Sequence, residues 1–136
     1  MKRLLLVLLL LCSIPVYSQI QWYKTTSMAI KYKRYNSYYG QYYWTDWSDW
    51  ERCVLNVKFD LNSDQIIIYS NKTQIYTVLY TEDQPRDNSG SQIRFKIIDQ
   101  DNDIGYLRLR IENNGNSQIY IDFNDVMWVY NVYRTN

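Results

Sequence analysis

The chain has 136 residues, enough for one domain with its own core, with 15 Lys and Arg against 14 Asp and Glu, no His and two Cys. A polyanion binder needs a basic surface that displaces counterions from phosphates, and this near-neutral balance offers none, so we expect no nucleic-acid partner. The absence of His excludes a Ser-His-Asp arrangement, an ordinary zinc site and an imidazole base.

The first 18 residues have the pattern of a secretory signal peptide. Lys2 and Arg3 precede an apolar run over residues 4–11, and the small side chain of Ser18 marks the expected cleavage site. A transmembrane helix needs about 20 apolar residues, so the run is too short to span a bilayer. We therefore expect no transmembrane segment and an exported protein, secreted, periplasmic or at the cell surface, whose domain is residues 19–136.

The two cysteines have different expected fates. Lipoprotein signals place a small residue before the acylated Cys, and Leu11 is not small, so we do not expect lipid anchoring at Cys12. Loss of Cys12 with the signal peptide leaves Cys53 as a single thiol without a disulfide partner. Cys53 starts an apolar alternation over residues 53–61, so we expect it to face the core as a small hydrophobic side chain.

The first half of the domain predicts strands by its apolar pattern. Apolar side chains alternate with lysines over residues 26–34, which predicts a strand with one wet face. Residues 52–61 give the cleanest alternation of the sequence and predict a second strand. Residues 66–69 and 75–80 are apolar on both faces and rich in β-branched side chains, which is typical of strands covered on both sides.

The second half continues in the same way after a predicted loop over residues 81–91, which has little to bury. Further strands are predicted over residues 93–97, 107–111, 119–123 and 127–133. Strands joined by such short turns are antiparallel neighbours. We expect a single all-β domain of about eight antiparallel strands in a meander, forming a small up-and-down barrel, with a two-sheet β-sandwich as the alternative. Closure removes edge strands, which favours the barrel.

Residues 35–50 hold eight aromatic side chains in 16 positions. Tyr and Trp rings give rigid contact area at low entropic cost and are enriched at recognition surfaces, so we predict a face that binds a glycan or a protein partner. Carboxylates between the tryptophans would orient the hydroxyl groups of a ligand. The predicted ligand-binding residues are Tyr39, Tyr42, Tyr43, Trp44, Trp47 and Trp50.

The same rings have a structural interpretation. They would then cover an open end of the barrel or pack on its outside, and the outward face would be built by Tyr76, Val78, Tyr80, Trp128 and Tyr130. A spacing of three sends successive side chains of a flat strand to opposite sides. The segment from Trp44 to Trp50 is therefore expected to twist or leave the sheet.

Trp44, Trp47 and Trp50, followed by Cys53, resemble the start of a thrombospondin type 1 repeat over ten residues. In that family the tryptophans interleave with arginines from a neighbouring strand, and cysteines pin the module. This chain lacks the partner cysteines, so the resemblance assigns no site residues. The expected architecture also resembles small exported lipocalin-like barrels, without a lipocalin motif.

Metal and enzyme chemistry find little support. Asp99, Asp101 and Asp103 have the spacing of calcium ligands, but Ile104 stands where a Gly is needed and Arg110 where a bidentate Glu is needed. We expect a solvated turn there, with no metal and no cofactor.

A glycosidase using the carboxylates of Asp49 and Glu51 is the surviving enzymatic option, and we expect no enzyme. The alternative function is a secreted inhibitor or an envelope-associated structural protein that makes its contacts through loops, without a small-molecule ligand. The oligomeric state has no signal in the sequence.

Overall fold

The computed structural model describes residues 20–84 and 86–136, and the predicted signal peptide lies outside these ranges. The described part of the chain contains no helix, and hence none long and apolar enough to cross a membrane. Its strands are β1 (Ile20–Asn36), β2 (Gln41–Trp44), β3 (Glu51–Arg52), β4 (Asn56–Asp60), β5 (Gln65–Tyr69), β6 (Gln74–Gln84), β7 (Gly90–Ile98), β8 (Ile104–Glu112), β9 (Ser117–Asp122) and β10 (Val126–Arg134).

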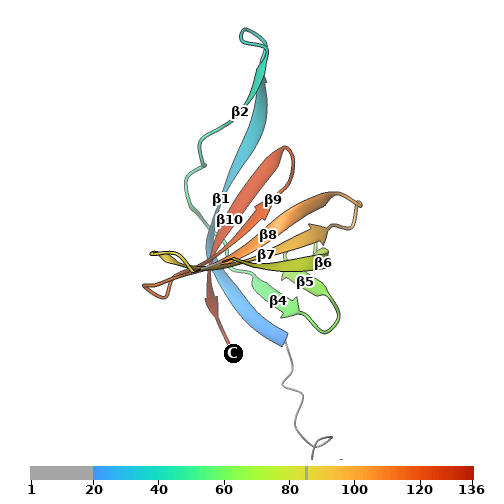
Figure 1. Cartoon of the computed structure of the whole chain (residues 1–136), viewed down its shortest axis with the longest axis vertical. Helices are drawn as coiled ribbons and strands as arrows, with labels where there is room; N and C mark the ends of the chain where they lie inside the picture. The colour runs from blue at the N-terminus through green and yellow to red at the C-terminus, as the bar shows by residue number, and fades with distance from the viewer. Residues whose placement is uncertain (1–19, 85) are drawn as a thin grey trace, which may run out of the picture.

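Strand β1 and strands β4 to β10 form a closed antiparallel barrel. Each of these strands pairs with the next, and β10 returns to pair with β1, from Tyr23 opposite Arg134 to Tyr32 opposite Val126. The predicted meander and the up-and-down barrel are confirmed, and the sandwich alternative is wrong. Figure 1 shows β2 and the end of β1 standing away from the other strands, at the top of the view.

The core fills the barrel with side chains that include most of the predicted inward faces of β4, β7, β8 and β9. Ile111 has the inward phase but is 40% exposed, because its strand ends there at the rim of the barrel. The buried side chains are Tyr23, Val57, Phe59, Ile66, Ile68, Tyr76, Val78, Phe95, Ile97, Leu107, Leu109, Ile119, Ile121, Tyr130 and Val132.

Strand β1 begins at Ile20, well before the predicted start at residue 26. The reason is a β-bulge, because Thr26 is an extra residue in the pairing with β10. The inward positions are Tyr23 and Thr25 before the bulge, and Met28 and the following even-numbered residues after it. An alternation read in one phase therefore misses the first part of the strand.

Thr25 is a buried polar residue that organises the next part of the chain. Its hydroxyl donates to the carbonyl oxygen of Cys53 (2.5 Å) and accepts from the N–H of Leu55 (2.8 Å). The predicted strand over residues 52–61 is consequently interrupted and is divided between β3 and β4. Cys53 is partly buried and packs against the core, as its phase predicted.

Two other expectations were wrong. Strand β6 continues to Gln84, although residues 81–84 were predicted to be loop, because polar side chains can occupy inward positions near the rim. Tyr76, Val78 and Tyr130 were placed on an outward face, but they are buried inside the barrel, and Trp128 packs against the same core. Strands that are apolar on both faces carry no signal of which face points inward.

The inward register predicts that alanine substitutions at two neighbouring positions of β7 will have very different effects on the free energy of unfolding. Phe95 is 2% exposed and its ring lies 5.9 Å from that of Phe59, so Phe95→Ala should lower the free energy of unfolding by about 3 to 5 kcal/mol. Arg94 faces solvent, and Arg94→Ala should cost about 1 kcal/mol or less. Urea unfolding measures both, and the reverse ranking would contradict the register.

The Thr25 hydroxyl should contribute more to the free energy of unfolding than a group that makes one hydrogen bond, because it makes two. Thr25→Val leaves a buried carbonyl and a buried N–H without their partner, and we expect a loss of about 2 to 4 kcal/mol in unfolding free energy. Thr77→Val at an exposed strand position is the matched control and should change stability by less than about 0.5 kcal/mol. Equal losses of stability in the two variants would mean that Thr25 does not stabilise the break between β3 and β4.

Candidate functional site

Residues 33–44 form a two-stranded arm that extends beyond the barrel. Strand β1 continues past the start of β10, and β2 pairs back on it from Lys33 opposite Trp44 to Asn36 opposite Gln41. At the tip, the Asn36 side-chain oxygen accepts from the N–H groups of Tyr38 (2.9 Å) and Tyr39 (3.3 Å). Gly40 closes the turn with φ of 64°, which suits glycine. The arm is therefore an ordered hairpin (Figure 1).

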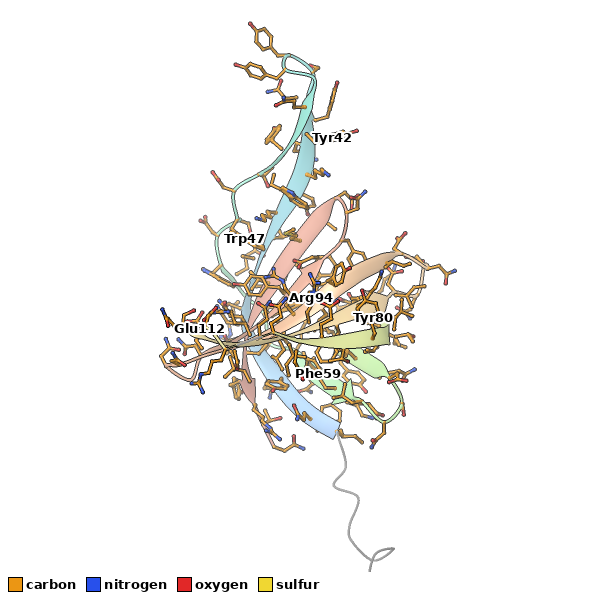
Figure 2. All side chains as sticks on the ribbon, viewed as in Figure 1. Tyr42, Trp47, Phe59, Tyr80, Arg94 and Glu112 are labelled. Atoms are coloured by element: carbon orange, nitrogen blue, oxygen red, sulfur yellow. The ribbon has the colours of Figure 1, made fainter. Side chains whose placement is uncertain are left out.

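The arm presents tyrosines on both of its faces and at its tip. Tyr35 and Tyr42 share one face, with ring centroids 5.0 Å apart, and Tyr43 lies on the other. Tyr38 is 87% exposed, Tyr39 71% and Tyr42 68%. Figure 2 shows Tyr42 on the arm, well away from Phe59 in the barrel. Rings of this size are usually covered in a folded protein, and these three are not.

Residues 45–50, the tryptophan segment, return along the open edge of β1. The N–H groups of Thr45 and Ser48 donate to the carbonyls of Tyr32 and Ile30, each at 2.8 Å. Their hydroxyls in turn accept from the N–H groups of the same two residues, each at 2.9 Å. Side-chain oxygens thus replace a strand partner, and the edge is satisfied without a regular ladder.

The pairing explains the spacing of the tryptophans. Three residues of the tryptophan segment span two residues of β1, so every third side chain returns to the same face. The Lys31 ammonium lies 4.7 Å from the ring centroid of Trp47 and 5.7 Å from that of Trp44. Trp44 and Trp47 are therefore on one side, as expected for a segment that has left the sheet.

Trp47 also covers part of the barrel wall. Its ring lies 6.3 Å from that of Tyr120, which sits opposite Val129 on β10, and Val129 sits opposite Ala29 on β1. Ala29 and Val129 have outward phase and are nevertheless buried. The indole of Trp47 extends over Ala29 and Val129 toward Tyr120 and shields this pair from solvent. The indole itself stays partly exposed.

The six predicted site residues do not form one flat face. Tyr42, Trp44 and Trp47 lie in a row with Lys31 and Lys33. The other three are separate.

Tyr39 is at the tip of the arm and Tyr43 is on its opposite face. Trp50 is 51% exposed, and its neighbour Glu51 pairs with Met28, which places Trp50 near Ala29. That these residues bind a ligand stays a prediction.

The aromatic rings on the barrel wall differ from Tyr38 and Tyr39 at the arm tip, because arginines that are themselves ion-paired cover the wall rings. Arg94 lies 4.5 Å from the Tyr106 ring centroid and pairs with Glu82 at 2.6 Å. Arg108 lies 4.4 Å from the Tyr120 ring centroid and pairs with an aspartate of β9 at 2.7 Å. The arginines of the wall thus have both a carboxylate and an aromatic ring as partners within the barrel.

The sequence patterns missed a second feature, a cavity of about 610 Å³ at the barrel end beside the arm. We call it the mouth. Its floor is made by Met28, Ile30, Tyr76, Trp128 and Tyr130, which point inward from three strands. Its rim is made by the turns before β6, β8 and β10, with Lys72, Thr73, Asp99, Gln100, Asp101 and Asp125.

The polar groups of the floor are paired. The Tyr76 hydroxyl donates to the side-chain carbonyl of Gln74 at 2.6 Å, and Gln74 and Trp128 hydrogen-bond the Tyr130 hydroxyl. Burial raises the pKa of both tyrosines, and the Asp99 carboxylate raises that of Tyr76 further. The floor is therefore a place of low polarity with a negative charge nearby.

The acidic turn over residues 99–103 binds its own backbone. One Asp99 carboxylate oxygen accepts from the N–H groups of Asp101 and Asp103, each at 2.9 Å. This is the solvated turn expected from the sequence. Within residues 20–84 and 86–136, no group of three His, Cys, Asp or Glu side chains is placed to hold a metal ion.

Comparison of the chain with protein-family models, with curated proteins and with solved structures gives no match. The assignment of function therefore depends on the geometry of the arm and the mouth.

The position of Trp47 predicts a modest structural role. Trp47→Ala should lower the unfolding free energy by about 1 to 2 kcal/mol, because the indole is 39% exposed and covers the Ala29 and Val129 pair. Tyr38→Ala at the arm tip should change it by less than about 0.5 kcal/mol. Urea titrations compare the two, and an unchanged stability for Trp47→Ala would mean that the wall does not need this cover.

Proposed function

We propose that the protein is an exported binding protein, not an enzyme, and that it engages a protein partner through the tip of the arm. The observation that carries this proposal is the exposure of Tyr38, Tyr39 and Tyr42 on a hairpin that stands clear of the barrel. Tyrosines on a projecting loop or hairpin give large contact area at small entropic cost, and a projecting element inserts into a concave surface of a partner.

The backbone of the arm supports the same proposal. In the described part of the chain β2 pairs with β1 alone, so its other edge faces solvent. An open strand edge offers N–H and C=O groups to an added strand, a common way to bind an extended peptide segment. Side chains of the arm would then supply specificity.

A glycan is the less favoured partner. Sugar rings stack on open aromatic faces, but the rings in the row from Tyr42 to Trp47 already face ammonium groups. Lys33 lies 5.4 Å from the Tyr42 ring centroid, and Lys31 lies close to both tryptophans. The contacts with Lys31 occupy tryptophan surfaces that a sugar would use, whereas Tyr42 keeps most of its surface exposed.

The test is quantitative capture from the extracellular and envelope fractions of the producing organism, using the full chain as bait. The triple variant Tyr38→Ser, Tyr39→Ser and Tyr42→Ser should weaken partner binding at least about tenfold, because central aromatic residues contribute most of the binding energy. Its thermal unfolding should stay close to that of the unmodified chain, since the three rings are exposed.

The matched control changes three exposed tyrosines of the barrel instead, Tyr69→Ser, Tyr80→Ser and Tyr133→Ser. It should keep the same partner within about twofold of the original affinity. Capture that survives the arm variant would overturn the proposal. Capture lost on periodate treatment of the fractions would assign the arm to a glycan instead.

A further inference from the structure

The side chains that line the mouth leave an open space inside this end of the barrel. Phe59 and Phe95 fill the barrel between its two ends, and the interior then opens beneath Met28, Ile30 and Trp128. The floor consists of the buried Tyr76 and Tyr130 and the half-buried Met28, Ile30 and Trp128, while the rim residues are mostly exposed, so the cavity opens to solvent. Its volume of about 610 Å³ lies within the range typical of small-molecule sites.

The charge at the rim is one-sided. Asp99, Asp101 and Asp125 line the mouth together with the ammonium of Lys72, and the Arg34 guanidinium lies beside it, 4.9 Å from the ring centroid of the lining residue Tyr32. The carboxylates of Asp101 and Asp125 form no hydrogen bond or ion pair with residues 20–84 or 86–136. On the barrel wall, in contrast, carboxylates are held by arginines. The rim thus carries more carboxylates than cations, and two of these carboxylates have no partner among the described residues.

We propose that the mouth binds a small organic cation, an amine or quaternary ammonium carried on an apolar body. The apolar body would lie on the floor, where aromatic rings of Tyr76 and Trp128 attract positive charge by their π faces. The ammonium group would lie toward Asp101 and Asp125, which supply the opposite charge. This site is distinct from the arm tip and goes beyond the proposed partner binding.

Other ligand classes fit less well. An anion would meet three carboxylates at the rim, and a metal ion would meet a floor of apolar side chains. A neutral apolar ligand fits the floor but gains nothing from the rim. The raised pKa of Tyr76, caused first by burial and then by Tyr130 and Asp99, agrees with an environment that disfavours negative charge.

The test is a titration of the full chain with phenylpropylammonium, phenylpropanol and phenylpropionate at low ionic strength, followed by NMR shifts of residues in the mouth. The three probes share one apolar body and differ in charge. The ammonium should bind at least about tenfold more tightly than the alcohol, and the carboxylate should bind most weakly. Added salt should reduce this preference.

Two variant pairs connect the preference to the rim. Asp101→Asn with Asp125→Asn should reduce the advantage of the ammonium over the alcohol to less than about threefold, with little effect on the alcohol. Asp46→Asn with Asp83→Asn removes the same charge from exposed positions elsewhere and should leave the advantage intact. Thr73→Trp, which places an indole at the rim, should weaken all three probes.

Equal affinity for ammonium and alcohol, an unchanged preference in the rim variant, or no binding at millimolar probe would each overturn the proposal. The arm-tip triple variant should bind the ammonium like the original chain, because none of its substituted residues lines the mouth. A failure of the arm proposal therefore leaves this result unaffected, and the two can be judged separately.

Discussion

The unequal pairing of the two edges of β1 determines the rest of the structure. One edge pairs with β10 from Tyr23 to Tyr32, which closes the barrel, while the other pairs with β4 only over residues 20–24. Beyond these residues the same edge pairs only with the two-residue β3, at Ser27 and Met28, and its remaining backbone N–H and C=O groups would be exposed at a considerable cost. The tryptophan segment meets this need through Ser48 and Thr45, and the turn into β4 meets it through Thr25. Beyond the barrel, the same strand continues into the arm.

The mouth follows from the same asymmetry. Because β4 ends its pairing early, the barrel wall beside residues 28–32 is completed by the tryptophan segment and not by a full strand. The inward side chains of this part of β1 then face the turn before β6 across open space. A barrel of this size normally fills its interior with side chains. In this barrel the packed core ends at Tyr76 and Tyr130, and the space beyond them is the mouth.

Sequence patterns predicted the elements whose two faces differ in polarity, and failed where they do not. The strands around Phe95, Leu107 and Ile121 alternate apolar and polar residues, so their inward faces were predicted correctly. Tyr76 and Tyr130 lie in strands that are apolar on both faces, and the wrong face was chosen. The single extra residue at Thr26 reverses the phase of β1 without any mark in composition. The mouth joins four segments distant in sequence, and no local pattern indicates such a meeting.

The aromatic residues within 35–50 do not all have the same surroundings. Lysine side chains contact some of the rings, and the rings at the arm tip have no such contact among the described residues. Lys31 and Lys33 pack on the rings nearest the barrel, and these contacts stabilise a two-stranded arm that would be marginal on its own. The lysines therefore act as scaffold for the arm. The rings beside Lys31 are poorer candidates for ligand contact than Tyr42, which Lys33 contacts but which keeps 68% of its surface exposed. Past Lys33 on that face no further cation follows along β1, and the tyrosines at the tip have only each other as neighbours, Tyr38 against Tyr39 at 4.9 Å. In the proposed binding of a partner, these rings would lose little conformational entropy, because the hairpin already fixes their positions.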